Sequence, residues 1–155
     1  MKIIEYRENL KNYFIDLNKE WIFKYFGEME SDDFDTFNNT DKIVSNGGMI
    51  LFAVNDNNDV LAVCMVKPLN NDGVWELCKL AANNNIPHKG AGTAVFEASV
   101  KWAENHGAKK ILILSNSKLK AAIHIYRKHN FKEIPIFDDE YKRVDIAFEL
   151  NLTNT

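Results

Sequence analysis

The fold is decided by one stretch, ELCKLAANNNIPHKGAGTA at residues 76–94. Residues 74–82 predict a β-strand and a helix is expected from about Ala91, so the loop between them carries Gly90 and Gly92. Such a junction brings backbone N–H groups and a helix N-terminus to one point, which favours an anion, and glycines let a phosphate approach closely. Lys89 adds a positive charge. A Gly-x-Gly pair alone also occurs in tight turns that bind nothing.

Two common nucleotide-binding motifs do not fit this loop. A P-loop needs Gly-x-x-x-x-Gly-Lys-Ser/Thr, which the sequence lacks. A dinucleotide fingerprint needs an early βαβ unit and a third glycine at position 95, which is Val95. The loop therefore indicates an anion site of another kind.

Outward from this stretch, the periodicity predicts a mixed sheet. Strands are expected near 2–6, 49–54, 60–67, 74–82, 110–114, 131–137 and 143–150, with a turn at 138–140. Helices are expected over about 13–22, from Ser31 or Asp32 to before Gly47, over 91–106, and over 118–129 after a cap at Asn116 or Ser117. This order predicts an α/β (α+β) domain with a mixed sheet, not a doubly wound parallel one.

Length and composition indicate one domain over residues 1–155. The chain is 46% hydrophobic and 26% charged, as expected for a globular protein with one core. Its net charge of −3 argues against a nucleic-acid partner, because phosphate binding needs clustered Lys and Arg. The longest apolar runs, such as 111–114, are strand-sized, so no membrane span is expected. Glu5 lies where a signal peptide needs apolar residues, so we expect a cytoplasmic protein.

The cysteines and histidines predict neither a disulfide framework nor a metal site. Cys64 and Cys78 lie in apolar strand-like segments, where a free thiol behaves as a small hydrophobe. The four histidines have no partner at the spacing of metal ligands.

A second segment, NSKLKAAIHIYRKHNF at residues 116–131, forms a second motif alongside the glycine loop. The two together resemble the motifs of the Gcn5-related N-acetyltransferase (GNAT) superfamily, whose members move an acetyl group from acetyl-CoA to an amine. The loop fits Gln/Arg-x-x-Gly-x-Gly/Ala, except that Pro87 occupies the first position. The second segment resembles Asn-x-x-Leu-x-x-Ala-Ile-x-Leu-Tyr-x-Lys-x-Gly-Phe, with Asn130 in place of the glycine. Asn130 preserves the left-handed backbone that closes the helix.

The resemblance implies a fold and a cofactor site. It implies about seven mostly antiparallel strands and about four helices, with the sheet splayed between strands 4 and 5 to admit acetyl-CoA. Backbone N–H groups at the end of the fourth strand would bind the pantetheine arm and polarise the thioester carbonyl, and the glycine loop would hold the diphosphate. Asn116 would either contact the arm or cap its helix. Pro87 removes a side-chain contact to the diphosphate, so weaker binding is expected. The implied cofactor-binding residues are Leu80, Ala81, Ala82, Lys89, Gly90, Ala91, Gly92, Thr93 and Asn116.

Two residues are candidates for catalysis. Tyr126 matches the family's tyrosine near the CoA sulfur, where a protonated phenol can donate to the leaving thiolate; the alternative is a core aromatic. Glu76, 14 positions before Gly90, lies where histone-acetylating members carry a strand carboxylate that acts as the base. Alternation would place Glu76, Cys78 and Leu80 on one face, with Leu77, Lys79 and Ala81 on the other, and burial would raise the carboxyl pKa. Alternatively, Glu76 is a solvated or ion-paired charge, and ordered waters deprotonate the amine.

An acidic run suggests the chemistry of the acceptor. Residues 28–35 hold five carboxylates and no cation, and in this family the first two helices line the acceptor side. The resemblance therefore suggests a cationic acceptor, such as a polyamine, an aminoglycoside-like amine or a lysine; a solvated acidic loop is the alternative. Neutralising Asp32, Asp33 and Asp35 together is expected to raise the acceptor KM.

The expected function is an acetyl-CoA-dependent N-acetyltransferase, acting without a metal. Direct attack within a ternary complex would acetylate a primary amine of a small molecule or peptide. Three alternatives stay open: Cys78 as an acyl-carrying nucleophile, a non-catalytic module that senses acyl-CoA, and a structural or interaction domain. Release of free thiol on addition of an amine separates the enzyme from the sensing module. A homodimer also stays open, because dimers are common among similar proteins.

Overall fold

A computed structural model describes residues 1–136 and 143–152 of the chain. Its elements, in chain order, are β1 (Lys2–Glu5), a short 3-10 helix η1 (Glu8–Leu10), α1 (Lys11–Phe26), α2 (Ser31–Asn38), α3 (Thr40–Ser45), β2 (Met49–Val54), β3 (Val60–Pro68), β4 (Val74–Ala82), α4 (Ala91–Asn105), β5 (Lys110–Ser115), α5 (Lys120–Lys128), β6 (Lys132–Ile134) and β7 (Ile146–Asn151). The turn predicted at 138–140 lies outside the described residues. Nowhere in the described part of the chain is a helix long and apolar enough to cross a membrane.

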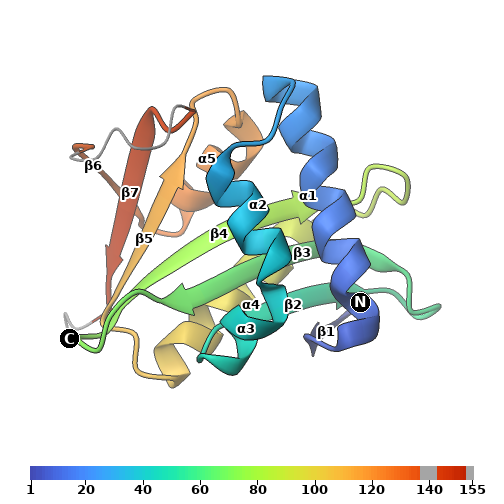
Figure 1. The fold of residues 1–155 in the computed structure, drawn as a ribbon, viewed down its shortest axis with the longest axis horizontal. Helices are drawn as coiled ribbons and strands as arrows, with labels where there is room; N and C mark the ends of the chain where they lie inside the picture. The colour runs from blue at the N-terminus through green and yellow to red at the C-terminus, as the bar shows by residue number, and fades with distance from the viewer. Residues whose placement is uncertain (137–142, 153–155) are drawn as a thin grey trace.

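Seven strands form one sheet in the order β1-β2-β3-β4-β5-β7-β6 (Figure 1). All neighbours are antiparallel except the parallel pair β4 and β5, which confirms the predicted mixed sheet.

The helix predicted from residue 31 to Gly47 is instead two helices, because Asn39 departs from helical backbone angles. Neither Ser31 nor Asp32 caps α2; Glu30 does, in a reciprocal capping box with Asp33.

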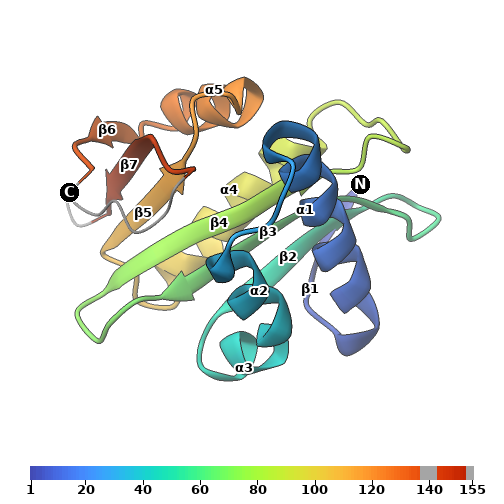
Figure 2. The ribbon, with the colours of Figure 1, turned by 45° about the horizontal axis from the view of Figure 1, so that its top comes forward.

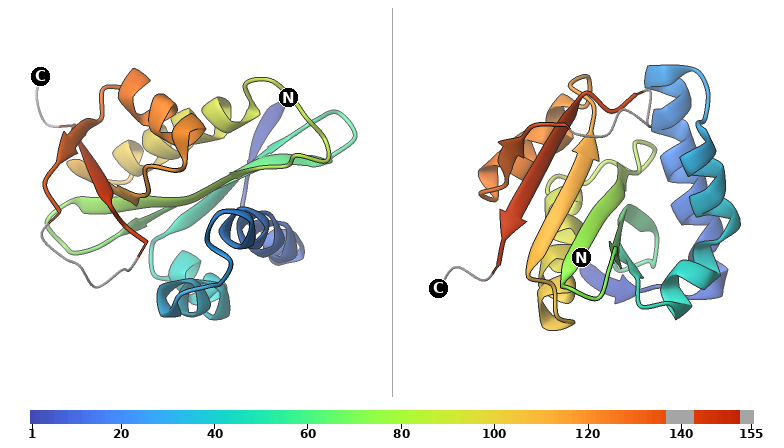
Figure 3. Two further views of the ribbon diagram at one scale, coloured as in Figure 1. Left: turned by 90° about the horizontal axis from the view of Figure 1, so that it is seen from above. Right: turned by 60° about the vertical axis from the view of Figure 1, so that its left-hand side comes forward.

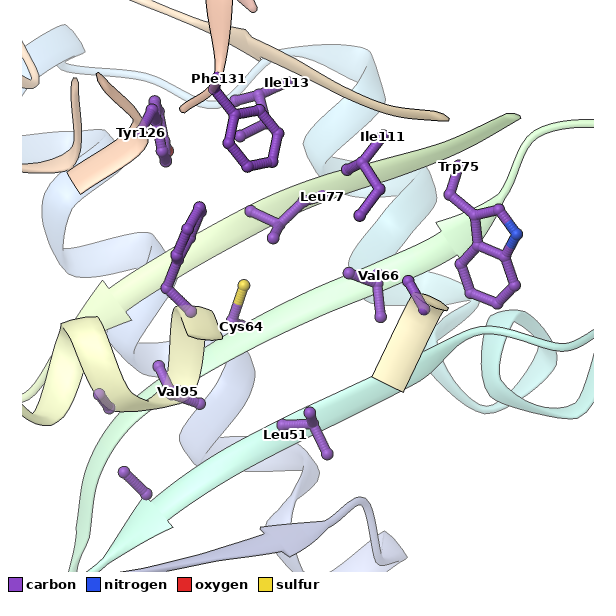
Figure 4. Packing of buried hydrophobic residues seen from close by; sticks show 14 of the residues in the cluster. Leu51, Cys64, Val66, Trp75, Leu77, Val95, Ile111, Ile113, Tyr126 and Phe131 are labelled. Carbon is purple, nitrogen blue, oxygen red and sulfur yellow. The ribbon is translucent and has the colours of Figure 1, made fainter. Parts of the chain in front are cut away.

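The sheet separates two layers of helices. Figure 3 shows α4 on one side of the sheet and α1, α2 and α3 on the other. The core accordingly has two parts. One, under α4 and α5, includes Leu77, Phe96 and Tyr126, some of which are shown in Figure 4. The other, under α1 and α2, includes Phe14 and Phe52.

The parallel pair β4 and β5 is short, and this opens the sheet. Only three residue pairs join the strands, from Val74 with Lys110 to Glu76 with Leu112. Beyond that point β4 stays paired with β3 as far as Ala82, while β5 follows β7 as far as Ser115. Figures 1 and 2 show the two strands diverging from their common start. The splay predicted between strands 4 and 5 is therefore present.

A β-bulge changes the faces of β4 along its second half. The register with β3 shifts between Val63 and Met65, and Lys79 has a left-handed φ of 55°. The predicted alternation is wrong here, because a bulge adds one residue and breaks the period of two. Cys78 packs toward the α1 side, Leu80 packs toward the α4 side, and Lys79 reaches Asp33 on α2.

One buried ion cluster, which we call the Asp33 cluster (Asp33, Lys79 and Arg143), ties three distant segments together. Asp33 is fully buried and accepts hydrogen bonds from Lys79 Nζ at 2.8 Å and from both terminal nitrogens of Arg143. Burial alone would raise the pKa of Asp33, but the hydrogen bonds and charges of Arg143 and Lys79 outweigh it and lower the pKa to about 2. The cluster joins α2 to β4 and to the residues preceding β7.

We predict that Asp33→Asn lowers the free energy of unfolding at pH 7 by about 3–5 kcal/mol, because it leaves the buried Lys79 and the half-buried Arg143 without their main counter-charge. The native pKa lies below the ordinary 3.8, so the contribution of Asp33 is complete above 3.8 and is lost as the pH falls toward 2. Urea unfolding at pH 7 and at about pH 3 measures both effects. Asp35→Asn, on the exposed side of the same helix, is the matched control and should change stability by less than about 0.5 kcal/mol. Equal losses for the two variants would contradict the prediction.

Candidate active site

A cavity occupies the gap where β4 and β5 separate. Its walls come from both diverging strands, from the start of α5, from α1, and from the loop before α2. The described residues that line it are Leu17, Glu20, Trp21, Tyr25, Glu30, Asp32, residues 76–82, Asn84, Gly92, residues 113–116, residues 119–122, Ile125, Tyr126, Arg143 and Val144. The cavity is thus walled by main chain on the sheet side and by aromatic and acidic side chains on the α1 side.

The sheet side presents the main chain of β4. Leu80, Ala81 and Ala82 all line the cavity, and their contact with a pantetheine arm stays a prediction. In the described chain, no strand pairs with the β5-facing edge of β4 beyond Glu76. Backbone groups on this edge are therefore available to a ligand, since paired backbone groups are the rule inside proteins.

The glycine loop is open at the surface. Gly90 precedes α4 with a φ of 88°, and a Cβ at Gly90 or Gly92 would meet no atom within 4 Å. Ala91 donates its N–H to the His88 carbonyl, but the N–H groups of Gly92 and Thr93 have no acceptor among the described residues. Of the five predicted loop residues, Gly92 lines the cavity. Lys89, Gly90, Ala91 and Thr93 are not among the lining residues, and Ala91 is buried in the core; the contacts of these four residues with a diphosphate stay a prediction.

Tyr126 is a core aromatic, as the alternative interpretation predicted, and it also lines the cavity; its role in proton transfer stays a prediction. Its ring lies 5.6 Å from the rings of Phe96 and Phe148, centroid to centroid, and 95% of its surface is buried. Figure 4 shows it with Phe131 in the cluster on the α4 side. Burial raises the pKa of the phenol, more than the hydrogen bond with Ser115 lowers it. The hydroxyl is therefore protonated at neutral pH and can act as an acid.

Glu76 lies where β4 leaves β5, with its side chain 19% exposed. Burial raises the pKa of the carboxyl above its ordinary value, while the charge of Lys67 lowers it by less. Lys67 is the residue of β3 that lies directly opposite Glu76, and its Nζ lies 3.7 Å from the Glu76 carboxylate. The ion pair is the alternative expected for Glu76; the carboxyl also lines the cavity, and its role as a general base stays a prediction.

Asn116 organises the turn before α5. Its Oδ1 accepts the N–H of Lys118 at 2.8 Å, and its Nδ2 donates to the Arg143 carbonyl at 2.6 Å. Helix α5 consequently begins at Lys120 rather than 118, and neither Asn116 nor Ser117 is its N-cap. The Ser117 N–H and hydroxyl both donate to Asp145, so β7 begins at Ile146 rather than near 143. Asn116 lines the cavity, and its contact with a cofactor arm stays a prediction.

Cys78 also lines the cavity, but its chemistry does not favour a nucleophile. Burial raises the pKa of the thiol, so the reactive thiolate is disfavoured. No histidine is among the described cavity residues that could deprotonate it. Nor does any group of three His, Cys, Asp or Glu within residues 1–136 and 143–152 have a geometry that could hold a metal ion.

The acidic run divides into two parts, which corrects part of the acceptor hypothesis. Asp33 is the buried centre of the Asp33 cluster, and Asp35 lies outside the cavity, so neither can contact an acceptor there. Asp32 and Glu30 do line the cavity. Glu20, Trp21 and Tyr25 line the same cavity and were not predicted from the sequence. The spacing of Leu17, Trp21 and Tyr25 by four residues does indicate that they share one face of α1. Lys79 and Arg143 were likewise not predicted as cavity residues.

Comparisons with known proteins match this geometry. The model of the Acetyltransferase (GNAT) family matches residues 13–131. The structure resembles a GNAT-family acetyltransferase from Staphylococcus aureus Mu50, with a TM-score of 0.85 at 18% identity over 98% of this chain and 99% of that one. It resembles a GNAT-superfamily phosphinothricin acetyltransferase from Sinorhizobium meliloti in complex with acetyl-CoA, with a TM-score of 0.78 at 12% identity over 97% and 88%. The structure of an aminoglycoside 6'-acetyltransferase type Ii aligns with a TM-score of 0.74 at 16% identity over 100% and 99%.

No curated protein sequence matches the chain. The structural similarities, all below 25% identity, show the fold, while the family model covers most of the chain and both motifs up to Phe131. The splayed sheet, the open glycine loop and this match agree with one another. The chain belongs to the GNAT acetyltransferase family.

Proposed function

We propose that this protein is an acetyl-CoA-dependent N-acetyltransferase that acts on a primary amine by direct attack in a ternary complex. The observation that carries the proposal is the cavity between β4 and β5, where the β5-facing edge of the main chain at 80–82, which no strand pairs in the described chain, borders the same space as Tyr126 and Glu76. Acetyl-CoA is the co-substrate that the family uses, and the Sinorhizobium meliloti relative is a complex with it.

In this proposal, some residues bind the cofactor and others transfer protons. The N–H groups of Gly92 and Thr93, at the start of α4, would hold the diphosphate, and the edge of β4 would hold the arm and polarise the thioester carbonyl. Glu76 removes a proton from the acceptor ammonium, directly or through water, so that the amine nitrogen can attack the carbonyl carbon. The C–S bond then breaks, and Tyr126 gives its proton to the departing thiolate.

A screen of acetyl-CoA with a panel of amines, read as release of free CoA thiol, tests the activity directly. The proposal expects thiol release that depends on one class of amine. Binding of CoA in calorimetry without thiol release for any amine would instead support the acyl-CoA-sensing alternative, which Pro87 at the usual Gln/Arg position leaves open. Absence of both binding and turnover would support a structural or interaction domain.

We predict that Tyr126→Phe and Glu76→Gln each lower kcat by about 10²- to 10⁴-fold, because each removes a proton-transfer group. CoA binding should change little, since neither side chain is assigned to the diphosphate or the arm. The Glu76 carboxyl is ionised, and can act as a base, only when the pH exceeds its raised pKa. The wild-type rate should therefore rise as the pH passes through that pKa, and Glu76→Gln should lose this rise. Tyr13→Phe and Glu104→Gln, both on the surface, are the matched controls. Wild-type rates for the two site variants would contradict their assignment.

The charge of the cavity supports a cationic acceptor. Four carboxylates line it, those of Glu20, Glu30, Asp32 and Glu76, against three cations. Lys79 and Arg143 are paired with the buried Asp33, and Lys79 also lies 4.0 Å from Asp32, while Lys120 lines the cavity at the start of α5. Trp21 and Tyr25 line the same wall. The Arg143 guanidinium already lies 5.4 Å from the centroid of the Trp21 ring, and Tyr25 adds a second aromatic ring that can attract a cation. An amine that carries a second positive charge therefore fits this end of the cavity better than a neutral or acidic one.

We predict that Asp32→Asn and Glu20→Gln each raise the KM of a dicationic amine about threefold or more, with little change for an amine that carries one charge. Threefold corresponds to about 0.7 kcal/mol, within the range of a partly exposed charge pair. The effect should weaken at high salt. Asp35→Asn, which lies outside the cavity, should leave both KM values unchanged. Equal effects on both amines would overturn the cationic assignment.

A further inference from the structure

The β4 bulge is held in a backbone conformation that its own residue does not favour. Lys79 has a φ of 55°, which lysine adopts rarely because its Cβ crowds the following carbonyl oxygen. A lysine side chain normally extends its ammonium to water, but Lys79 is only 8% exposed. Its Nζ is instead directed into the protein, 2.8 Å from Asp33 Oδ1. Something outside the local backbone must therefore stabilise the bulge.

Asp33 is a rigid partner for this lysine. Besides Lys79, it accepts the Glu30 N–H at 2.8 Å and both terminal nitrogens of Arg143. The Arg143 guanidinium is fixed in turn, because it lies 5.4 Å from the centroid of the Trp21 ring and 5.6 Å from that of Phe26. A carboxylate held by four donors cannot follow a moving lysine, so the ion pair restrains Lys79.

The restrained residue lies within the main chain that lines the cavity. Cys78, Lys79, Leu80 and Ala81 all border it, and the bulge decides which backbone groups of this segment face β3 and which face the gap. A bulge that relaxed to regular strand geometry would shift the register of Leu80, Ala81 and Ala82 by one residue. The N–H groups there would then turn away from the positions in which the structure presents them.

We propose that Lys79 is a positioning residue: its ion pair with Asp33 holds the β4 bulge in the left-handed conformation and so directs the main chain at 80–82 toward bound acetyl-CoA. The inference rests on the proposed function, in which this main chain binds the pantetheine arm. Lys79 itself needs no contact with the reacting atoms.

Two substitutions of the same lysine separate this role from simple charge neutralisation. Both Lys79→Met and Lys79→Gly leave Asp33 without its ammonium partner. Methionine keeps the unfavourable backbone and removes its restraint, whereas glycine adopts a positive φ freely. Lys79→Met should weaken CoA binding about tenfold in calorimetry and speed amide hydrogen exchange across residues 77–82 about tenfold. Lys79→Gly should stay within about threefold of wild type in CoA binding. Lys110→Met on β5, which removes the surface pair with Glu149 on β7, is the control and should match wild type in both.

Equal weakening of CoA binding by Met and Gly, or no effect of either, would overturn the proposal. Amide exchange does not need a ligand, so it keeps the proposal testable if wild-type protein fails to bind CoA, a result that would count against the proposed function alone. In that case, exchange in Lys79→Met as slow as in wild type would overturn the positioning role. Should Lys79→Met not fold, Lys79→Gln takes its place in the same comparison with glycine.

Discussion

The whole site depends on where one parallel strand pair stops. β4 and β5 share three residue pairs and then follow different neighbours, β3 on one side and β7 on the other. Strands in a sheet normally satisfy each other's backbone groups, so the separation leaves an edge of main chain that only a ligand or water can satisfy. Neighbouring strands twist relative to each other, and pairing partners on opposite sides draw β4 and β5 apart. The cavity is therefore a consequence of sheet topology before any side chain contributes to it.

The backbone and side-chain groups that line the cavity make its two ends chemically different. The N–H groups at the start of α4 and the small residues Ala81, Ala82 and Gly92 suit an anionic and extended ligand. On the α1 side, carboxylates and aromatic rings suit a cation. Tyr126 and Glu76 lie between hydrophobic core and cavity, and burial moves the pKa of each upward. In their proposed roles, burial makes the glutamate a stronger base, whereas the tyrosine, protonated at neutral pH even at its ordinary pKa of 10, stays protonated.

Much of this arrangement could be predicted from sequence, because its signals are local. Strand patterns near residues 49–82, the helix after Gly90 and the left-handed Asn130 are set by neighbouring residues. The candidates Tyr126 and Glu76 come instead from the resemblance to GNAT motifs, and both line the cavity. The bulge at Lys79 was not predictable, because no glycine marks it and the strand pattern continues through it. Nor could the Asp33 cluster be found, since its members are 46 and 110 residues apart and each looks like an ordinary surface charge. The charge pattern therefore predicts one uniform acidic run, whereas burial assigns Asp33 to the core and leaves Asp32 at the cavity.

The central claim is that two stretches of main chain bind the cofactor: the β4 edge at the gap with β5, and the start of α4. A titration of isotope-labelled protein with CoA, followed by backbone amide chemical shifts, tests it most directly. The account predicts that the largest shifts fall on residues 80–82 and 90–93, with small changes on β1, β2 and α3. Shifts that are absent at saturating CoA, or that concentrate on elements away from the gap, would contradict it.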